Sequence, residues 1–259
     1  MKFSGDMEQD CKQYKSFFSP TPENTILFEA SPEYLAYIEN VAPRIRQLLP
    51  DARLLFVLRN PVDRLYSHFN FAKGKLHLPQ DISFEQFIDY CERFNDGQIS
   101  ASESGIAEQY LRALEIGNYI RYLENFYEEF ETDKIRVMFY EEFDINPLQK
   151  LIEISEFIGV SPSFYDGFTM YRANVTFSAR VKFLHFIALS FNRWLEPLLR
   201  QHPTLKHRLV KLYKSFNKDN RGFVPMQAET RNKLVDYYAP SNAKLKQFLD
   251  GQKMPPWVS

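Results

Sequence analysis

The hydrophobic positions of the chain fall into short continuous runs separated by longer stretches with helical spacing. Three apolar runs have the length of strands: 26–29 (ILFE), 54–58 (LLFVL) and 135–140 (IRVMFY). The run at 54–58 is apolar at every position, which is typical of a strand buried on both faces. Strands that alternate with helices predict an α/β fold, with a parallel sheet and helices on both of its faces.

The predicted helices begin at short polar residues that can accept hydrogen bonds from a first helical turn. Three of these caps are followed by proline, whose missing N–H costs nothing in that turn. The expected helix starts are Ser31-Pro32, Asn60-Pro61, Ser83 and Asn146-Pro147. We expect the first helix to break near Pro43 and a last helix, 229–249, to be interrupted at Pro240. A long helical tract is expected at about 106–130, and two more at about 180–200 and 203–216.

Composition and charge exclude several classes of protein. The 259 residues are enough for one domain, 1–259, with a full core. A net charge of −1 argues against nucleic-acid binding, which needs a basic excess. Two cysteines form no disulfide framework, and no spacing indicates a zinc or other metal site. No apolar run has the length of a membrane span, so we expect a cytoplasmic protein.

The turn at Leu58-Arg59-Asn60-Pro61 carries the clearest chemical signal. Ligands bind beyond the carboxyl ends of parallel strands, and a helix that begins there directs free N–H groups toward the ligand. The guanidinium of Arg59 can bind a phosphate through two hydrogen bonds, and Ser67 can add a hydroxyl from the helix. An alternative has equal weight on these grounds: Arg59 pairs with Asp63, and Ser67 is a surface serine.

The segment LLFVLRNPVDRLYSHF, 54–69, resembles the 3′-phosphate-binding segment of sulfotransferases that use 3′-phosphoadenosine 5′-phosphosulfate (PAPS), above all the heparan sulfate and bacterial branch. The resemblance implies a P-loop-like three-layer α/β fold with a central parallel sheet and extra C-terminal helices. It also implies that Arg59 and Ser67 bind the 3′-phosphate of PAPS, and of the product PAP. No metal is implied.

Three further segments resemble the same family in the same order: FEASPEYL (28–35), IRVMFYEEFDINPLQKLIEISEFIGV (135–160) and NRGFVP (220–225). The last is similar to a loop that closes over the nucleotide, which implies that Arg221 contacts phosphate oxygens. Gly222 would let the backbone approach closely. Together the four segments cover most of the chain, except a helical insert at about 165–215.

The family's first strand, and the lysine-bearing loop that holds the 5′-phosphosulfate, have no counterpart in the sequence. We therefore expect an N-terminally truncated chain, a divergent member that fills the gap otherwise, or a degenerate relative. Glu29, at the end of the run 26–29, is the candidate catalytic base. His68 lies beside Ser67, but a histidine there more often packs or donates a hydrogen bond.

Two functions remain open. The first is transfer of a sulfuryl group from PAPS to a hydroxyl or amine of a glycan or small-molecule acceptor. The second is a catalytically incomplete relative that acts as a nucleotide-binding or interaction protein.

The apolar helix 181–199 favours core packing or a homodimer contact, with an acceptor cleft or a membrane surface as alternatives. If an upstream membrane anchor is missing from this sequence, the expected location is the Golgi lumen instead of the cytoplasm. A nucleotide kinase is disfavoured because no G-x-x-x-x-G-K-(S/T) sequence is present.

Overall fold

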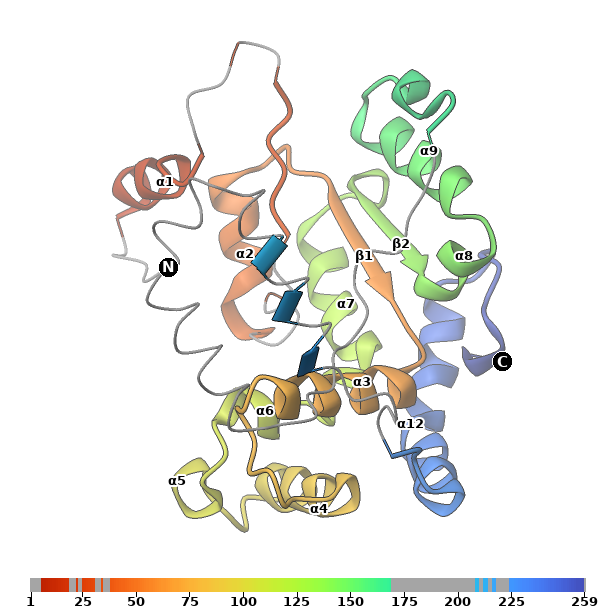
Figure 1. Ribbon diagram of the computed structural model, residues 1–259. Helices are drawn as coiled ribbons and strands as arrows, with labels where there is room; N and C mark the ends of the chain where they lie inside the picture. The colour runs from red at the N-terminus through yellow and green to blue at the C-terminus, as the bar shows by residue number, and fades with distance from the viewer. Residues whose placement is uncertain are drawn as a thin grey trace. The chain divides into compact units, whose positions relative to one another are not determined.

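The computed structural model describes residues 6–18, 22, 25–30, 34, 38–168, 208–209, 212–213, 216–217 and 224–258 (Figure 1). The chain forms two compact units. Unit 1 comprises Met1–Arg59, Asn118–Met170 and Ala239–Ser259, and unit 2 comprises Asn60–Gly117 and Tyr171–Tyr238. The prediction of a single domain with a helical insert stays a prediction, because most of the insert lies outside the described residues.

The sheet of unit 1 has two parallel strands in the described part of the chain. Strand β1 (Leu54–Leu58) pairs with β2 (Ile135–Phe139), in a register that places Leu54 beside Ile135 and Leu58 beside Phe139. Figure 1 shows the two arrows side by side and pointing the same way. Two of the predicted strands, and their parallel order, are therefore confirmed.

The predicted strand at 26–29 is wrong. Residues 25–30 have no regular secondary structure, and the side chains of Ile26, Leu27 and Phe28 are 50%, 48% and 70% exposed. A strand is stabilised by pairing with a neighbour and by burial of at least one face. This run has neither in the described structure, so its apolar composition alone was misleading.

In the described part of unit 1, the sheet is surrounded or extended by α1 (Met7–Lys15), α2 (Ile38–Leu48), α7 (Tyr119–Glu129), α8 (Tyr140–Ile145), α9 (Pro147–Ile158) and the end of the last helix. As predicted, Asn146 caps α9 by accepting from the backbone N–H of Gln149, and the helix ends at Gly159 with φ of 83°. The predicted break near Pro43 is wrong, because Pro43 lies inside α2. Unit 1 also contains short 3₁₀ turns at Thr132–Lys134, Pro162–Tyr165 and Pro256–Val258.

The core of unit 1 lies on one face of the sheet. The inward side chains of both strands pack against α2, α7 and the end of the last helix. The strands contribute Phe56, Leu58, Val137 and Phe139, and the helical segments contribute Ala42, Ile120, Leu123, Phe126, Leu245 and Leu249. On β1, however, Val57 is 46% exposed. The expectation of a strand buried on both faces is therefore wrong for this position, since a continuous apolar run does not itself provide a second covering layer.

Unit 2 is helical in its described part. It contains α3 (Pro61–Gly74), α4 (Phe84–Asn95), α5 (Ala101–Ser104), α6 (Glu108–Leu111), a 3₁₀ turn (Glu115–Gly117) and the first part of α12 (Ala228–Phe248). The predicted start at Ser83 is confirmed by a capping box with Gln86. Pro240 does not interrupt α12, and the expected tract 106–130 is divided into α6, the 3₁₀ turn and α7.

Gly117 ends the 3₁₀ turn against a buried tyrosine, and this contact yields a first prediction. A Cβ atom at Gly117 would clash with Cε1 of Tyr238, whose ring is fully buried and whose hydroxyl donates to the Leu114 carbonyl over 2.7 Å. Because the ring is held in place, Gly117→Ala is expected to lower the free energy of unfolding by about 2 kcal/mol. Urea denaturation measures the loss.

The matched control is the double variant Gly117→Ala with Tyr238→Leu, whose smaller side chain leaves room for the new methyl group. If the clash is the cause, the double variant loses less stability than the sum of the two single variants. Strictly additive losses would contradict a steric cause.

Candidate functional site

Arg59 lies at the carboxyl end of the sheet, directly after the last residue of β1. Leu58 pairs with Phe139, so the residues that follow them, Arg59 and Tyr140, leave the same edge of the sheet. The Cζ atom of Arg59 lies 4.9 Å from the centroid of the Tyr140 ring, which is a cation–π contact. This edge of a parallel sheet is where ligands of α/β proteins bind.

The backbone of Arg59 is held by a second tyrosine. The hydroxyl of Tyr119, the first residue of α7, donates to the Arg59 carbonyl oxygen over 2.8 Å. Tyr119 is only 3% exposed, and its ring packs edge-on against Trp257 with 6.2 Å between the centroids. The end of β1 is thus fixed by a buried hydrogen bond as well as by its ladder.

The start of α3 confirms the predicted cap and corrects its expected use. The side-chain oxygen of Asn60 accepts from the backbone N–H groups of Val62 and Asp63, over 3.0 and 3.3 Å. The sequence predicts free N–H groups here that bind an anion. Because the Asn60 side chain accepts from two of them, these two N–H groups are not free to bind an anion.

Two charged residues of α3 have structural partners within unit 2. Asp63 forms an ion pair with Arg231 of α12, with 2.6 Å between Oδ1 and Nη2. The alternative in which Asp63 is the partner of Arg59 is therefore not supported by the observed pairing. Arg64 donates to the carbonyl oxygen of Ala113, which ties the first turn of α3 to the segment before the 3₁₀ turn.

Ser67 and His68 follow on α3 and differ in their surroundings. The Ser67 side chain is half-buried, and no side-chain hydrogen bond of Ser67 is present among the described residues. The ring of His68 packs against Tyr110, with 5.6 Å between the centroids. Burial, with a smaller contribution from the charge of Arg64, lowers the pKa of His68 to about 4. His68 is therefore a neutral packing residue, the role that the sequence favoured.

Glu29 is an exposed carboxylate in unit 1 that accepts two tyrosine hydroxyls. The hydroxyl of Tyr14 donates to Oε2 over 2.7 Å, and the hydroxyl of Tyr34 donates to Oε1. Burial first, and then this hydrogen bond, raise the pKa of Tyr34 to about 12. The candidate base thus has a proton donor on each of its two oxygens.

The remaining candidate residues, Arg221 and Gly222, lie outside the described residues, as does the segment 181–199. The description resumes at Val224, whose carbonyl oxygen accepts from the hydroxyl of Tyr66 on α3. The binding roles of Arg59, Ser67, Arg221 and Gly222 stay predictions. Arg59 belongs to unit 1 and Ser67 to unit 2, so the structure describes each within its own unit.

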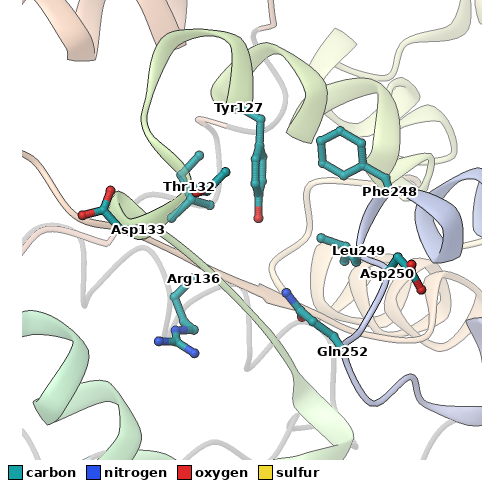
Figure 2. Close-up of a pocket in the computed structure, with 9 residues that line it drawn as sticks. Tyr127, Thr132, Asp133, Arg136, Phe248, Leu249, Asp250 and Gln252 are labelled. Carbon is teal, nitrogen blue, oxygen red and sulfur yellow. The ribbon is translucent and has the colours of Figure 1, made fainter.

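A pocket of about 320 Å³ lies at the opposite end of the same sheet. Its lining includes Ile135 and Arg136, the first residues of β2, together with Tyr127, Phe248 and Gln252. Figure 2 shows the Tyr127 hydroxyl directed into the pocket, whereas the carboxylates of Asp133 and Asp250 point away from it. A five-residue strand places this pocket roughly 13 Å from the carboxyl end of the sheet, so it is distinct from the surroundings of Arg59.

The described residues contain neither a candidate metal centre nor a candidate membrane-spanning helix. They contain no group of three or more histidine, cysteine or acidic side chains arranged to hold a metal ion. Among the helices of the described ranges, none is both long and apolar enough to cross a membrane.

The sequence did not reveal the roles of Tyr119 and Tyr140. The sequence predicts Tyr140 as the last residue of a strand, whereas it begins α8. Its position beside Arg59 depends on the register of β1 and β2, which are separated by about eighty residues of chain. Tyr119 lay inside a long predicted helix, and nothing in that pattern marked it as the start of α7.

Comparisons with known proteins concern the family and the fold. Residues 41–181 match the family described as sulfotransferase domain. The chain is 26% identical over 251 residues to the bifunctional heparan sulfate N-deacetylase/N-sulfotransferase 4 of Mus musculus, a match that covers 95% of this chain and 25% of the relative. It is 29% identical over 136 residues to sulfotransferase 1A1 of Mus musculus, covering 48% and 40% of the two chains.

A solved structure, that of a sulfotransferase from Alicyclobacillus acidocaldarius, resembles the fold with a TM-score of 0.62. The two sequences are 20% identical, and the match covers 96% of this chain and 74% of the other. This likeness confirms the predicted fold class, α/β with a parallel sheet. The chain spans about 25% of the length of the N-deacetylase/N-sulfotransferase that it matches.

Proposed function

The chain belongs to the sulfotransferase domain family, and from this premise we propose that it transfers a sulfuryl group from PAPS to a hydroxyl or amine of a glycan or small-molecule acceptor. The observation that carries the proposal is Arg59 at the carboxyl end of the sheet, where its guanidinium faces an aromatic ring instead of a carboxylate. A guanidinium that keeps its charge can bind a phosphate through two hydrogen bonds.

The proposed donor site uses Arg59 and Ser67 for the 3′-phosphate, because this group distinguishes PAPS from common adenine nucleotides. Arg221 and Gly222 are proposed to close over the nucleotide from the loop before Val224. No metal is needed for these contacts, since cationic side chains and hydroxyl groups supply the charge and the donors.

The proposed base is Glu29, whose carboxylate can take a proton from the acceptor as sulfur–oxygen bond formation begins. Both of its oxygens accept tyrosine hydroxyls. An acceptor hydroxyl or amine would therefore replace one of these two donors. The mouse relative is a heparan sulfate N-deacetylase/N-sulfotransferase by name, which supports an amine-bearing glycan as the first acceptor to test.

Binding of PAP, the product that remains after sulfuryl transfer, tests the proposal. At 100 times its dissociation constant, a ligand stabilises the folded state by about 2.7 kcal/mol. For a protein of this size, that stabilisation raises the melting temperature by about 5 °C or more. We expect this shift with PAP and a much smaller one with adenosine 5′-phosphate at the same concentration, because the latter lacks the 3′-phosphate.

Transfer from radiolabelled PAPS to a glycan with free amines, and to a phenol, then measures turnover and acceptor class. An unchanged melting temperature at saturating PAP would contradict the proposed donor. A shift without transfer to any acceptor would instead support the non-catalytic alternative. The cytoplasmic location and the homodimer through 181–199 stay predictions, to be checked by fractionation and by light scattering.

A further inference from the structure

Tyr119 and Tyr140 both contact Arg59, one through its backbone and the other through its side chain. We infer that these two tyrosines are positioning residues, which hold the Arg59 guanidinium in place for the 3′-phosphate. This inference rests on the proposed function, because it concerns the same donor site.

The contact with Tyr140 orients the guanidinium without neutralising it. A ring face attracts a cation through its quadrupole and brings no formal negative charge. A carboxylate in the same place would pair with the guanidinium and compete with an incoming phosphate. Within the described part of unit 1, Arg59 forms no ion pair with a carboxylate. The ring is thus a partner that leaves the positive charge available to a ligand.

The contact with Tyr119 fixes the backbone from which the Arg59 side chain leaves. Arg59 lies beyond the last paired residue of β1, so the ladder with β2 does not hold it directly. The buried hydroxyl of Tyr119 supplies a hydrogen bond to its carbonyl oxygen at this point. Because an arginine has four rotatable side-chain bonds, a fixed backbone and a fixed end together restrict its reach far more than either contact alone.

One indole ring contacts Tyr119 and the residue that precedes Tyr140. Trp257 packs edge-on against Tyr119, and it packs edge-on against Phe139 with 5.7 Å between the centroids. Phe139 is the last residue of β2 and directly precedes Tyr140. The two contacts to Arg59 therefore adjoin the same aromatic cluster, which consists of Tyr119, Phe139 and Trp257.

Calorimetric titration of the whole chain tests the inference with PAP and with adenosine 5′-phosphate as the two probes. Tyr140→Leu removes the ring face, and Tyr140→Phe keeps it as the matched control. We expect Tyr140→Leu to weaken PAP binding by about 3- to 10-fold and Tyr140→Phe to leave it unchanged. Tyr119→Phe removes only the hydroxyl and is expected to weaken PAP binding by about 3-fold. The affinity for adenosine 5′-phosphate should not change in any of these variants.

The decisive comparison is made in the Arg59→Ala background. If Tyr140 acts through Arg59, Tyr140→Leu has no further effect on PAP binding once the guanidinium is absent. An equal loss in both backgrounds, or an equal loss for both nucleotides, would overturn the inference, because the ring would then contact the nucleotide or only stabilise the fold. Binding of PAP that depends on Arg59 but not on either tyrosine overturns this inference alone. A wild-type chain that does not bind PAP overturns the proposed function together with it.

Discussion

Arg59→Ala is expected to weaken PAP binding by about 100-fold or more and to abolish the thermal shift that PAP produces. Removing one partner of a hydrogen-bonded charge pair costs about 2–5 kcal/mol of binding free energy, since the other charge then lacks its counterpart. Arg59→Lys should recover only part of the affinity, because an ammonium group is a point charge and cannot bind a phosphate through a planar pair of donors. Isothermal titration calorimetry measures the affinity for PAP of the wild type, Arg59→Ala and Arg59→Lys.

The matched control is Arg136→Ala. Arg136 is an exposed arginine on β2 of the same sheet, but it lies at the amino end, where its Cζ atom is 5.4 Å from the centroid of the Phe157 ring. It has the same charge and a similar aromatic contact, and we expect no change in PAP affinity when it is removed. If Arg136→Ala weakens binding as much as Arg59→Ala, the nucleotide site lies elsewhere or the effect is only one of net charge. Melting temperatures without ligand show whether each variant is folded.

Local sequence signals predicted the elements around Arg59 well. Asn60-Pro61, Ser83 and Asn146-Pro147 each begin a helix, and the runs 54–58 and 135–140 contain the two parallel strands. These features depend on a few adjacent residues, whose capping and packing preferences are visible in the sequence. The position of Arg59 at the end of a strand followed from them.

Features that depend on distant contacts were not predictable in the same way. The run 26–29 has the composition of a strand, but it is exposed and unpaired in the described structure. Pro43 and Pro240 lie inside helices that continue through them. In each case the outcome depends on tertiary packing, which a pattern of neighbouring residues does not contain.

The surroundings of the candidate site show the same limit at the level of side chains. The sequence offered Asp63 as an alternative partner of Arg59, since the two residues are close in the chain. The structure instead pairs Asp63 with Arg231, 168 positions away, and places the Tyr140 ring against Arg59. Charge and aromatic partners of this kind depend on strand register and on helix packing. A sequence can therefore predict that Arg59 is a hydrogen-bond donor, but it does not predict which side chain contacts its guanidinium.

His68 is expected to make the stability of the protein depend on pH in the acidic range. Burial lowers the pKa of His68 to about 4 in the folded chain, whereas the unfolded chain has a histidine pKa of about 6.5. Below the unfolded value the unfolded state takes up a proton that the folded state does not. The contribution of neutral His68 to the free energy of unfolding is therefore fully present above about pH 6.5 and is lost as the pH falls toward about 4. The free energy of unfolding decreases by an amount on the order of 3 kcal/mol over this range.

The measurement compares wild type with His68→Phe by urea denaturation between pH 7.5 and 4.5. Phenylalanine retains a ring against Tyr110 and cannot take up a proton, so the variant should lose less stability than wild type as the pH falls. Relative to wild type, the free energy of unfolding of His68→Phe then rises by about 1.36 kcal/mol for each unit by which the pH falls between the two pKa values. Ser67→Ala, a neighbouring change on α3 that adds or removes no titrating group in this range, is the control and should follow the wild-type curve. A difference between His68→Phe and wild type that stays constant across this range would show that His68 is not a buried neutral histidine, because a side chain accessible to protons would titrate alike in the folded and unfolded chains.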